Sequence, residues 1–201
     1  MLCLKVSTDS SWAQIAGQNF HDVLRDHAHC ELKAASHALS LIGRHELNHE
    51  MATKLSELAR EELDHFERVL QFLRERGGVL GFPQKDAYAA KLRKASSSIY
   101  IGNELLLADR LLVGALIEAR SCERFKLLLA HPVIQEDKEL HAFYTELFET
   151  EAKHFRTYCD LALLACGDAA FVSKRLEELS HLEAEVVREL EHEENRATIH
   201  G

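Results

Sequence analysis

The chain has 201 residues, of which 46% are hydrophobic and 28% are charged, and its formal net charge is −9 at pH 7. This length is enough to bury a sizeable apolar core, so we expect a single domain over residues 1–201. The net charge argues against non-specific binding to nucleic acid such as DNA or to an anionic membrane, because both surfaces are negative. It does not exclude a local basic patch.

The five cysteines are odd in number and form no Cys-x-x-Cys pair. Both features argue against a disulfide framework, a zinc ribbon or a rubredoxin-like iron site. The N-terminus lacks a basic stretch followed by an apolar run, which a signal peptide would require. No apolar run reaches the roughly 18 residues of a transmembrane helix. We therefore expect a cytoplasmic protein.

Apolar residues recur at three- and four-residue spacing almost throughout, which predicts helices and no strands. Only 9 glycines and 2 prolines are present, which leaves little material for turns. Caps and breakers predict helices over 10–42 (bent near Gly17), 46–76, 87–94, 103–130, 135–165 and 168–194. The prediction is an all-α bundle of four long helices over about 10–166. A short helix lies in the connection between its two hairpins, and a further helix follows at the C-terminus.

A carboxylate and an imidazole recur at the same spacing on two of these helices. In REELDHFERVL, Glu62 and His65 are three residues apart and share one face of the helix. In ETEAKHF, Glu151 and His154 repeat the spacing. A single pair of this kind is usually solvated, but both of these pairs lie on faces that otherwise carry core residues. Two such pairs are difficult to obtain by chance.

Two single glutamates on the other long helices complete the pattern. Glu31 and Glu118 are flanked by small apolar residues, and each precedes its Glu-x-x-His partner by nearly the same number of residues. Four buried carboxylates need compensating charge, which two divalent metal ions supply. Oxygen ligands with one imidazole per metal suit iron or manganese better than zinc or copper. The set matches ferritin-like dinuclear carboxylate sites, and its predicted ligands are Glu31, Glu62, His65, Glu118, Glu151 and His154.

Four segments resemble the family of tRNA hydroxylases that act on 2-methylthio-isopentenyl-adenosine: HAHCELKAASHAL, LAREELDHFERVLQFLRERGG, ALIEARSCERF and ETEAKHFRTY. The resemblance runs from about residue 10 to 190 and includes all six ligand positions. It implies a ferritin-like, O2-dependent diiron monooxygenase, with two iron ions favoured over manganese. The implied reaction hydroxylates the isopentenyl group of the modified adenosine next to the anticodon. The implied partners are the tRNA anticodon stem-loop and an electron-donor protein or reductase.

Contacts to tRNA phosphates require lysine or arginine, and recognition of loop bases usually adds aromatic stacking. The densest basic cluster surrounds the connection between the two hairpins, where Phe82 and Tyr88 are interleaved. The alternative is ordinary surface charge on an acidic protein. The predicted tRNA-binding residues are Arg74, Arg76, Lys85, Lys91, Arg93 and Lys94.

Other interpretations stay open at this point. One alternative is another ferritin-like dimetal oxidoreductase, such as a quinone-precursor hydroxylase or an aldehyde-deformylating oxygenase. Others are a protein of iron storage or peroxide defence and a metal-free helical interaction module. The small residues Ala35, Ala38, Gly114 and Ala115 indicate either a substrate pocket or close helix packing. His27, His29, His37 and His181 are interpreted as surface residues or neighbours of the ligands.

Overall fold

The computed structural model describes residues 2–83, 87–97, 103–191 and 198–199. Within these ranges the chain forms helices and no strand, as the spacing of apolar residues predicts. The helices are α1 (Ser10–Gln18), α2 (Phe20–Arg44), α3 (His49–Glu75), α4 (Ala87–Ser97), α5 (Asn103–Leu129), α6 (Pro132–Gln135), α7 (Lys138–Cys166) and α8 (Ala169–Glu191).

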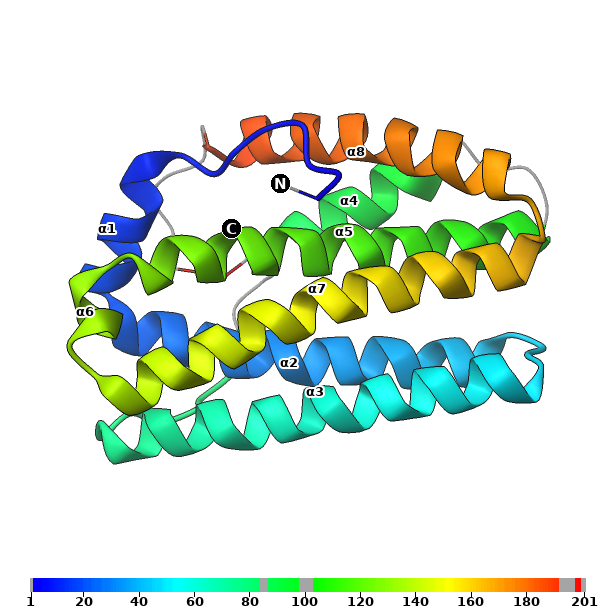
Figure 1. Cartoon of the computed structure of the whole chain (residues 1–201). Helices are drawn as coiled ribbons and strands as arrows, with labels where there is room; N and C mark the ends of the chain where they lie inside the picture. Colours follow the sequence, from blue (N-terminus) through cyan, green and yellow to red (C-terminus); the bar gives the residue numbers. More distant parts are fainter. Residues whose placement is uncertain (1, 84–86, 98–102, 192–197, 200–201) are drawn as a thin grey trace.

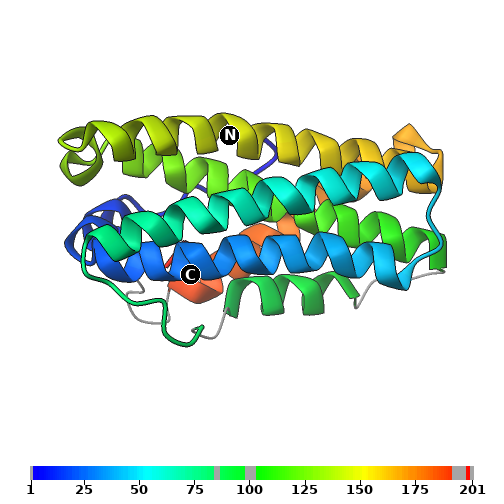
Figure 2. The same ribbon diagram turned by 90° about the horizontal axis from the view of Figure 1, so that it is seen from below.

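The four long helices α2, α3, α5 and α7 form a bundle of two antiparallel hairpins (Figure 1). Backbone packing is closest within the hairpins, between α2 and α3 and between α5 and α7. The helices α4 and α8 pack on each other and on α5. Seen from below, α4 lies at the edge of the bundle opposite α7 (Figure 2), and Figure 1 shows it between α5 and α8. The fold is therefore the predicted ferritin-like bundle, with a short helix between the hairpins and an extra C-terminal helix.

The predicted first helix over 10–42 is wrong in one respect, because the chain breaks it into α1 and α2 at Asn19. The Asn19 N–H bonds back to the carbonyls of Ile15 and Ala16, and its φ of −117° is not helical. Gly17, where a bend was expected, serves packing instead. A Cβ there would lie 2.1 Å from the ring of His131, so only glycine lets this ring approach α1.

The predicted C-terminal end of α3 is confirmed by a Schellman motif. Gly77 takes a φ of 74°, and the Gly78 N–H bonds to the Leu73 carbonyl at 2.9 Å. Gly167, with a φ of 69°, ends α7 in the same left-handed conformation.

The start of α7 also differs from the prediction. The turn α6 lies where the helix over 135–165 was expected to begin, and Asp137 caps the N-terminus of α7 by accepting the Leu140 N–H at 3.0 Å. That side-chain cap moves the start of α7 to Lys138. The predicted cap at Asp168 is confirmed, since it accepts the backbone N–H of Ala170 and Phe171. The last residues of the helix expected over 168–194 lie outside the described ranges.

Two apolar clusters fill the bundle and leave a gap between them. On α3, the first cluster takes residues up to Ala59 and the second begins at Phe66. On α7, the second cluster ends at Phe148 and the first resumes at Phe155. The predicted ligands fall between the two clusters on all four long helices, so each side of their layer is walled by side chains that exclude water.

Candidate metal centre

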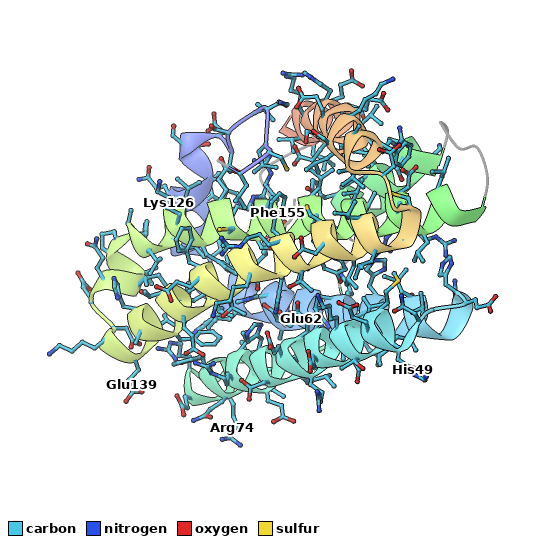
Figure 3. All side chains as sticks on the ribbon, turned by 45° about the vertical axis from the view of Figure 1, so that its right-hand side comes forward. His49, Glu62, Arg74, Lys126, Glu139 and Phe155 are labelled. Atoms are coloured by element: carbon cyan, nitrogen blue, oxygen red, sulfur yellow. The ribbon has the colours of Figure 1, made fainter. Side chains whose placement is uncertain are left out.

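The structure brings the six predicted ligands together at the middle of the bundle, where every one of them is at most 5% exposed. Figure 3 shows Glu62 in the interior between the α3 and α7 ribbons, whereas Arg74 and Glu139 project outward from the bundle. Each helix supplies its ligands from the stripe that faces the other hairpin. The six residues selected by the sequence spacing therefore lie together at one level of the bundle.

The ligand atoms form two groups, each within 4.8 Å of one another. One group is Glu31, Glu62, His65 and Glu151, and the other is Glu62, Glu118, Glu151 and His154. The two glutamates of the Glu-x-x-His pairs belong to both groups, so each could bridge two metal ions. Each group then adds one single glutamate and one histidine.

Both histidines point Nδ1 into this cluster. His65 Nδ1 lies 3.4 Å from Glu62 Oε2 and 3.6 Å from Glu31 Oε2. His154 Nδ1 lies 2.8 Å from Glu62 Oε1. The two imidazole rings are 5.8 Å apart between centroids. One nitrogen per group and shared carboxylates is the arrangement of dinuclear carboxylate sites.

The residues present fit a pair of metal ions, because several buried oxygen and nitrogen atoms of the cluster lack hydrogen-bond partners, whose place a metal could take. Five atoms are buried and have no hydrogen-bond partner of acceptable geometry among the described residues: Oε1 and Oε2 of Glu62, Oε2 of Glu151, and Nδ1 of His65 and of His154. Buried polar groups are nearly always hydrogen-bonded, and a buried charge without compensation costs several kcal/mol. These atoms are the ones that would coordinate metal.

Within the described chain, no lysine or arginine forms an ion pair with the carboxylates of the cluster, so their pKa values depend on burial and on the neighbouring histidines. Burial raises the pKa of the Glu62 carboxyl, and it raises that of Glu118 well above the usual range. Burial also raises the pKa of Glu31, but the hydrogen bond from His27 and the nearby imidazole of His65 outweigh it and lower the pKa to about 2. For His65, burial lowers the pKa, and the carboxylates of Glu31 and Glu62 outweigh burial and raise it to about 10.

Neighbouring residues hold the ligands in place, as expected around a metal site. His27 is fully buried, and its Nε2 lies 2.6 Å from Glu31 Oε1 while its Nδ1 lies 3.1 Å from the Tyr144 hydroxyl. His154 Nε2, on the side away from the cluster, lies 2.9 Å from Glu61 Oε2. In the sequence, the i, i+4 spacing to Glu31 could have identified His27 as a hydrogen-bond partner of a ligand, but no sequence signal could have identified Tyr144.

A cavity of about 800 Å³ leads to the cluster between α2 and α5 and under α4. Its inner wall includes Glu31, Glu118 and Glu151, together with Tyr158 and Gly114. A Cβ on Gly114 would lie 3.0 Å from the Tyr158 ring, so the glycine makes room for this tyrosine beside the ligands. Of the four small residues considered in the sequence, Gly114 lines the cavity, whereas Ala35, Ala38 and Ala115 are fully packed.

The predicted tRNA-binding residues do not form one cluster in the structure. Arg93 on α4 lines the cavity. Arg74 lies at the C-terminal end of α3, where the adjacent Arg76 forms an ion pair with Asp137. On α4, Lys94 is exposed and Lys91 lies 3.5 Å from Glu189, while Lys85 lies outside the described residues. Of the two interleaved aromatics, Phe82 is 95% exposed and Tyr88 is buried.

The fold and the site define a ferritin-like protein with a carboxylate- and histidine-rich site for two metal ions. The sequence model of one family, tRNA-(MS[2]IO[6]A)-hydroxylase (MiaE), matches residues 1–200. The chain belongs to this family. None of the described helices has the length and apolar character needed to cross a membrane.

Known relatives agree with this assignment. The chain is 39% identical over 181 residues to the tRNA 2-(methylsulfanyl)-N(6)-isopentenyladenosine(37) hydroxylase of Pseudomonas putida, covering 90% of this chain and 84% of that protein. The protein of the same name from Salmonella typhimurium is 36% identical over 130 residues, which is 65% of this chain and 45% of the relative. Among solved structures, "Protein 43 with aldehyde deformylating oxygenase activity" from Synechococcus matches with a TM-score of 0.87 and 36% identity, over 100% of this chain and 96% of that one.

Proposed function

We propose that this protein hydroxylates the isopentenyl group of 2-methylthio-isopentenyl-adenosine, the modified nucleoside next to the anticodon of tRNA. The observation that carries the proposal is the cavity that reaches Glu31, Glu118 and Glu151. Its volume of about 800 Å³ suits a nucleoside with its substituents, because ligand pockets usually measure about 300–1,000 Å³. Membership of the hydroxylase family and the relatives' names support this substrate.

The six ligands would hold two iron ions, with manganese as the chemically compatible alternative. When bound, the metal pair supplies the activation of O2 that organic side chains do not provide. In the overall reaction, a C–H bond of the isopentenyl group becomes C–OH. One O2, two electrons and two protons are consumed, and the second oxygen atom leaves as water. The electrons require an electron-donor protein or reductase as partner. A tRNA substrate places the reaction in the cytoplasm.

The chain's own residues orient the metal ligands, exclude water from the site and position the substrate. His27 and Glu61 fix the orientation of Glu31 and His154, as their short hydrogen bonds indicate. The two apolar clusters above and below the ligand layer exclude water, which protects a reactive centre from side reactions. The cavity wall positions the substituent to be hydroxylated against Glu118 and Glu151.

The proposal is tested by mass spectrometry of nucleosides from the tRNA of a strain that lacks this gene. We expect the hydroxylated nucleoside to be absent, its unhydroxylated precursor to accumulate, and the wild-type gene to restore the hydroxylated form. A gene carrying Glu151→Ala should not restore it. Identical nucleoside profiles with and without the gene would overturn the proposal.

A second candidate follows from the match to the Synechococcus protein, whose name describes aldehyde deformylating oxygenase activity. The two share 36% identity over the whole of this chain, and an aldehyde would reach the metal ligands through the same cavity. The purified, iron-loaded protein should be assayed with a long-chain aldehyde for release of the formyl group as formate. Formate release without tRNA hydroxylation would favour this candidate over the first.

A further inference from the structure

Three arginines from three different helices gather at the outer wall of the cavity. Arg44 is the last residue of α2, Arg93 lies on α4 and Arg110 lies on α5, and all three line the cavity. Arg44 and Arg93 are exposed, and Arg110 is half-buried. No carboxylate within the described ranges forms an ion pair with any of them. A protein of net charge −9 therefore concentrates uncompensated positive charge at this mouth.

Two histidines report this positive charge through their pKa values. Burial, together with the charges of Arg93 and Arg110, lowers the pKa of His37 to about 4. Burial also lowers the pKa of His45, and Arg110 and Arg44 add to the shift. Arg110 donates to His45 Nε2 at 2.9 Å. Since each histidine senses two of the three arginines, the guanidinium groups converge on one region.

The acidic part of the cavity wall does not cancel this charge. Outside the metal ligands, the carboxylate in the described lining is Asp109, and Arg175 binds it in a bidentate pair at 2.6 and 2.7 Å. Arg175 thus neutralises Asp109 on the side of α8. Positive charge from Lys33 and from the three arginines therefore dominates the cavity wall outside the metal ligands.

We infer that this mouth, defined by Arg44, Arg93 and Arg110, docks the phosphate backbone on either side of the target nucleoside, while the base enters the cavity. The inference rests on the proposed function and names the RNA-binding surface of the same site. Arginine forks suit phosphate oxygens, and a nucleoside turned out of the anticodon loop carries a phosphate on each side. Arg44 and Arg110 were not among the residues expected from the sequence.

Two features of the wall suit an inserted base. His37 lies between the arginines and the metal ligands along α2, and its buried Nε2 has no hydrogen-bond partner in the described chain. Such an atom costs roughly 1–3 kcal/mol, so a polar edge of a base would satisfy it. Six residues separate Glu31 from His37, about 9 Å along the helix. Pro83 lines the cavity next to Phe82, whose 95% exposed ring is available for stacking on a neighbouring base.

The test measures binding of a prenylated anticodon stem-loop RNA by fluorescence anisotropy at several salt concentrations, together with hydroxylation of the same RNA. Each of Arg44→Ala, Arg93→Ala and Arg110→Ala should weaken binding, and each should reduce the slope of log K against log salt by about 0.7, the value for one phosphate contact to a single strand. The triple variant should reduce it by about 2. Lysine at the same positions should largely retain the slope.

Matched controls are Arg60→Ala and Arg156→Ala, which remove exposed arginines on α3 and α7 that do not line the cavity. They should leave affinity and slope unchanged. If the wild type hydroxylates the RNA and the folded triple variant binds it with wild-type affinity and slope, the docking surface is wrong. Loss of affinity in Arg74→Ala and Lys91→Ala instead would also overturn it. If the wild type neither binds nor hydroxylates the RNA, the proposed function itself fails.

Discussion

Helix α5 contributes a buried anionic side chain to one cluster and a buried cationic side chain to another. Glu118 belongs to the metal-ligand cluster of four glutamates and two histidines. Two residues later, Arg120 faces α8 and binds Glu183 in a bidentate pair at 2.9 and 3.0 Å. Arg120 also forms an ion pair with Glu123, which accepts from the Thr8 hydroxyl at 2.7 Å. We call this second cluster the Arg120 network.

The two clusters differ in whether all of their buried polar atoms have hydrogen-bond or ion-pair partners. In the Arg120 network, Tyr88 donates to Glu183 at 3.0 Å, and no side-chain atom is left without a partner. In the metal-ligand cluster, atoms of Glu62, Glu151, His65 and His154 lack partners. A buried network is stable when every group is satisfied, and a partly satisfied one is not. The comparison indicates that the Arg120 network is structural and that the metal-ligand cluster requires ligands from outside the chain.

Removing a shared ligand should have the largest effect on activity. We expect Glu151→Ala to reduce hydroxylation below detection and to lower metal content for both ions, because Glu151 belongs to both groups of ligand atoms. Metal analysis and nucleoside mass spectrometry measure the two effects. The control is Glu149→Ala on the exposed face of the same helix, and equal metal content in the two variants would contradict the assignment.

The largest effect on stability should come from the Arg120 network. Glu183→Ala leaves the fully buried Arg120 guanidinium without its bidentate partner, and such a loss costs about 3–5 kcal/mol. Urea denaturation measures the free energy of unfolding, with the exposed Glu185→Ala as control. Metal content of the folded fraction should stay at the wild-type value. A loss comparable to the control's would show that the network is not stabilising.

The stability of the metal-free protein should show most clearly that the metal-ligand cluster, unlike the Arg120 network, is unfavourable without its ligands. Glu118→Leu removes a buried carboxyl whose pKa is raised by burial, so it should stabilise the metal-free protein by roughly 1–3 kcal/mol. The same variant should gain less than the wild type when metal is added, since it has lost one ligand. Thermal denaturation without added iron measures the stability of the metal-free variant, and denaturation with added iron measures the stabilisation by metal. Destabilisation of the metal-free form would mean that Glu118 is satisfied without metal.

The hydrogen bond from His27 to Glu31 should affect the metal rather than the fold. His27→Phe keeps a ring among Phe125, Phe143 and Tyr144, and it removes the 2.6 Å bond. Loss of such a neighbour typically lowers metal affinity or activity by about 10–100-fold. Competition with a chelator measures the affinity. The control is His29→Phe, a buried histidine on the same helix that contacts the Leu80 carbonyl, which should retain wild-type affinity.

The pH dependence of the metal-free protein should give the smallest effect. The folded-state pKa of His65 is raised from 6.5 to about 10, so its contribution to stability is complete below pH 6.5 and is lost as the pH rises towards 10. The free energy of unfolding should therefore fall over this range relative to a His65→Gln variant. Bound metal replaces the proton, so the loaded protein should not show this difference. An equal slope in both metal-free proteins would contradict the prediction.

The sequence by itself determined the fold class and several helix ends, and it selected the six candidate ligands that the structure brings together. Glu62 and His65 lie on one helical face because the backbone repeats every 3.6 residues, and the repeat at Glu151 and His154 reports the same geometry. Gly77 and Asp168 mark helix ends through local hydrogen bonds that depend on neighbouring residues only. Such features are encoded by short-range spacing.

Only the tertiary structure decided which charged groups meet across helices. Arg120 and Glu183 are far apart in the chain, and in the sequence Glu183 is indistinguishable from the exposed glutamates around it on α8. The predicted basic cluster is continuous in sequence, yet α3 and α4 lie on different sides of the bundle, while Arg44, Arg93 and Arg110 come from three helices to one mouth. Helical periodicity fixes the face of each residue, but the packing of hairpins fixes which faces meet, and that depends on contacts distant in the chain.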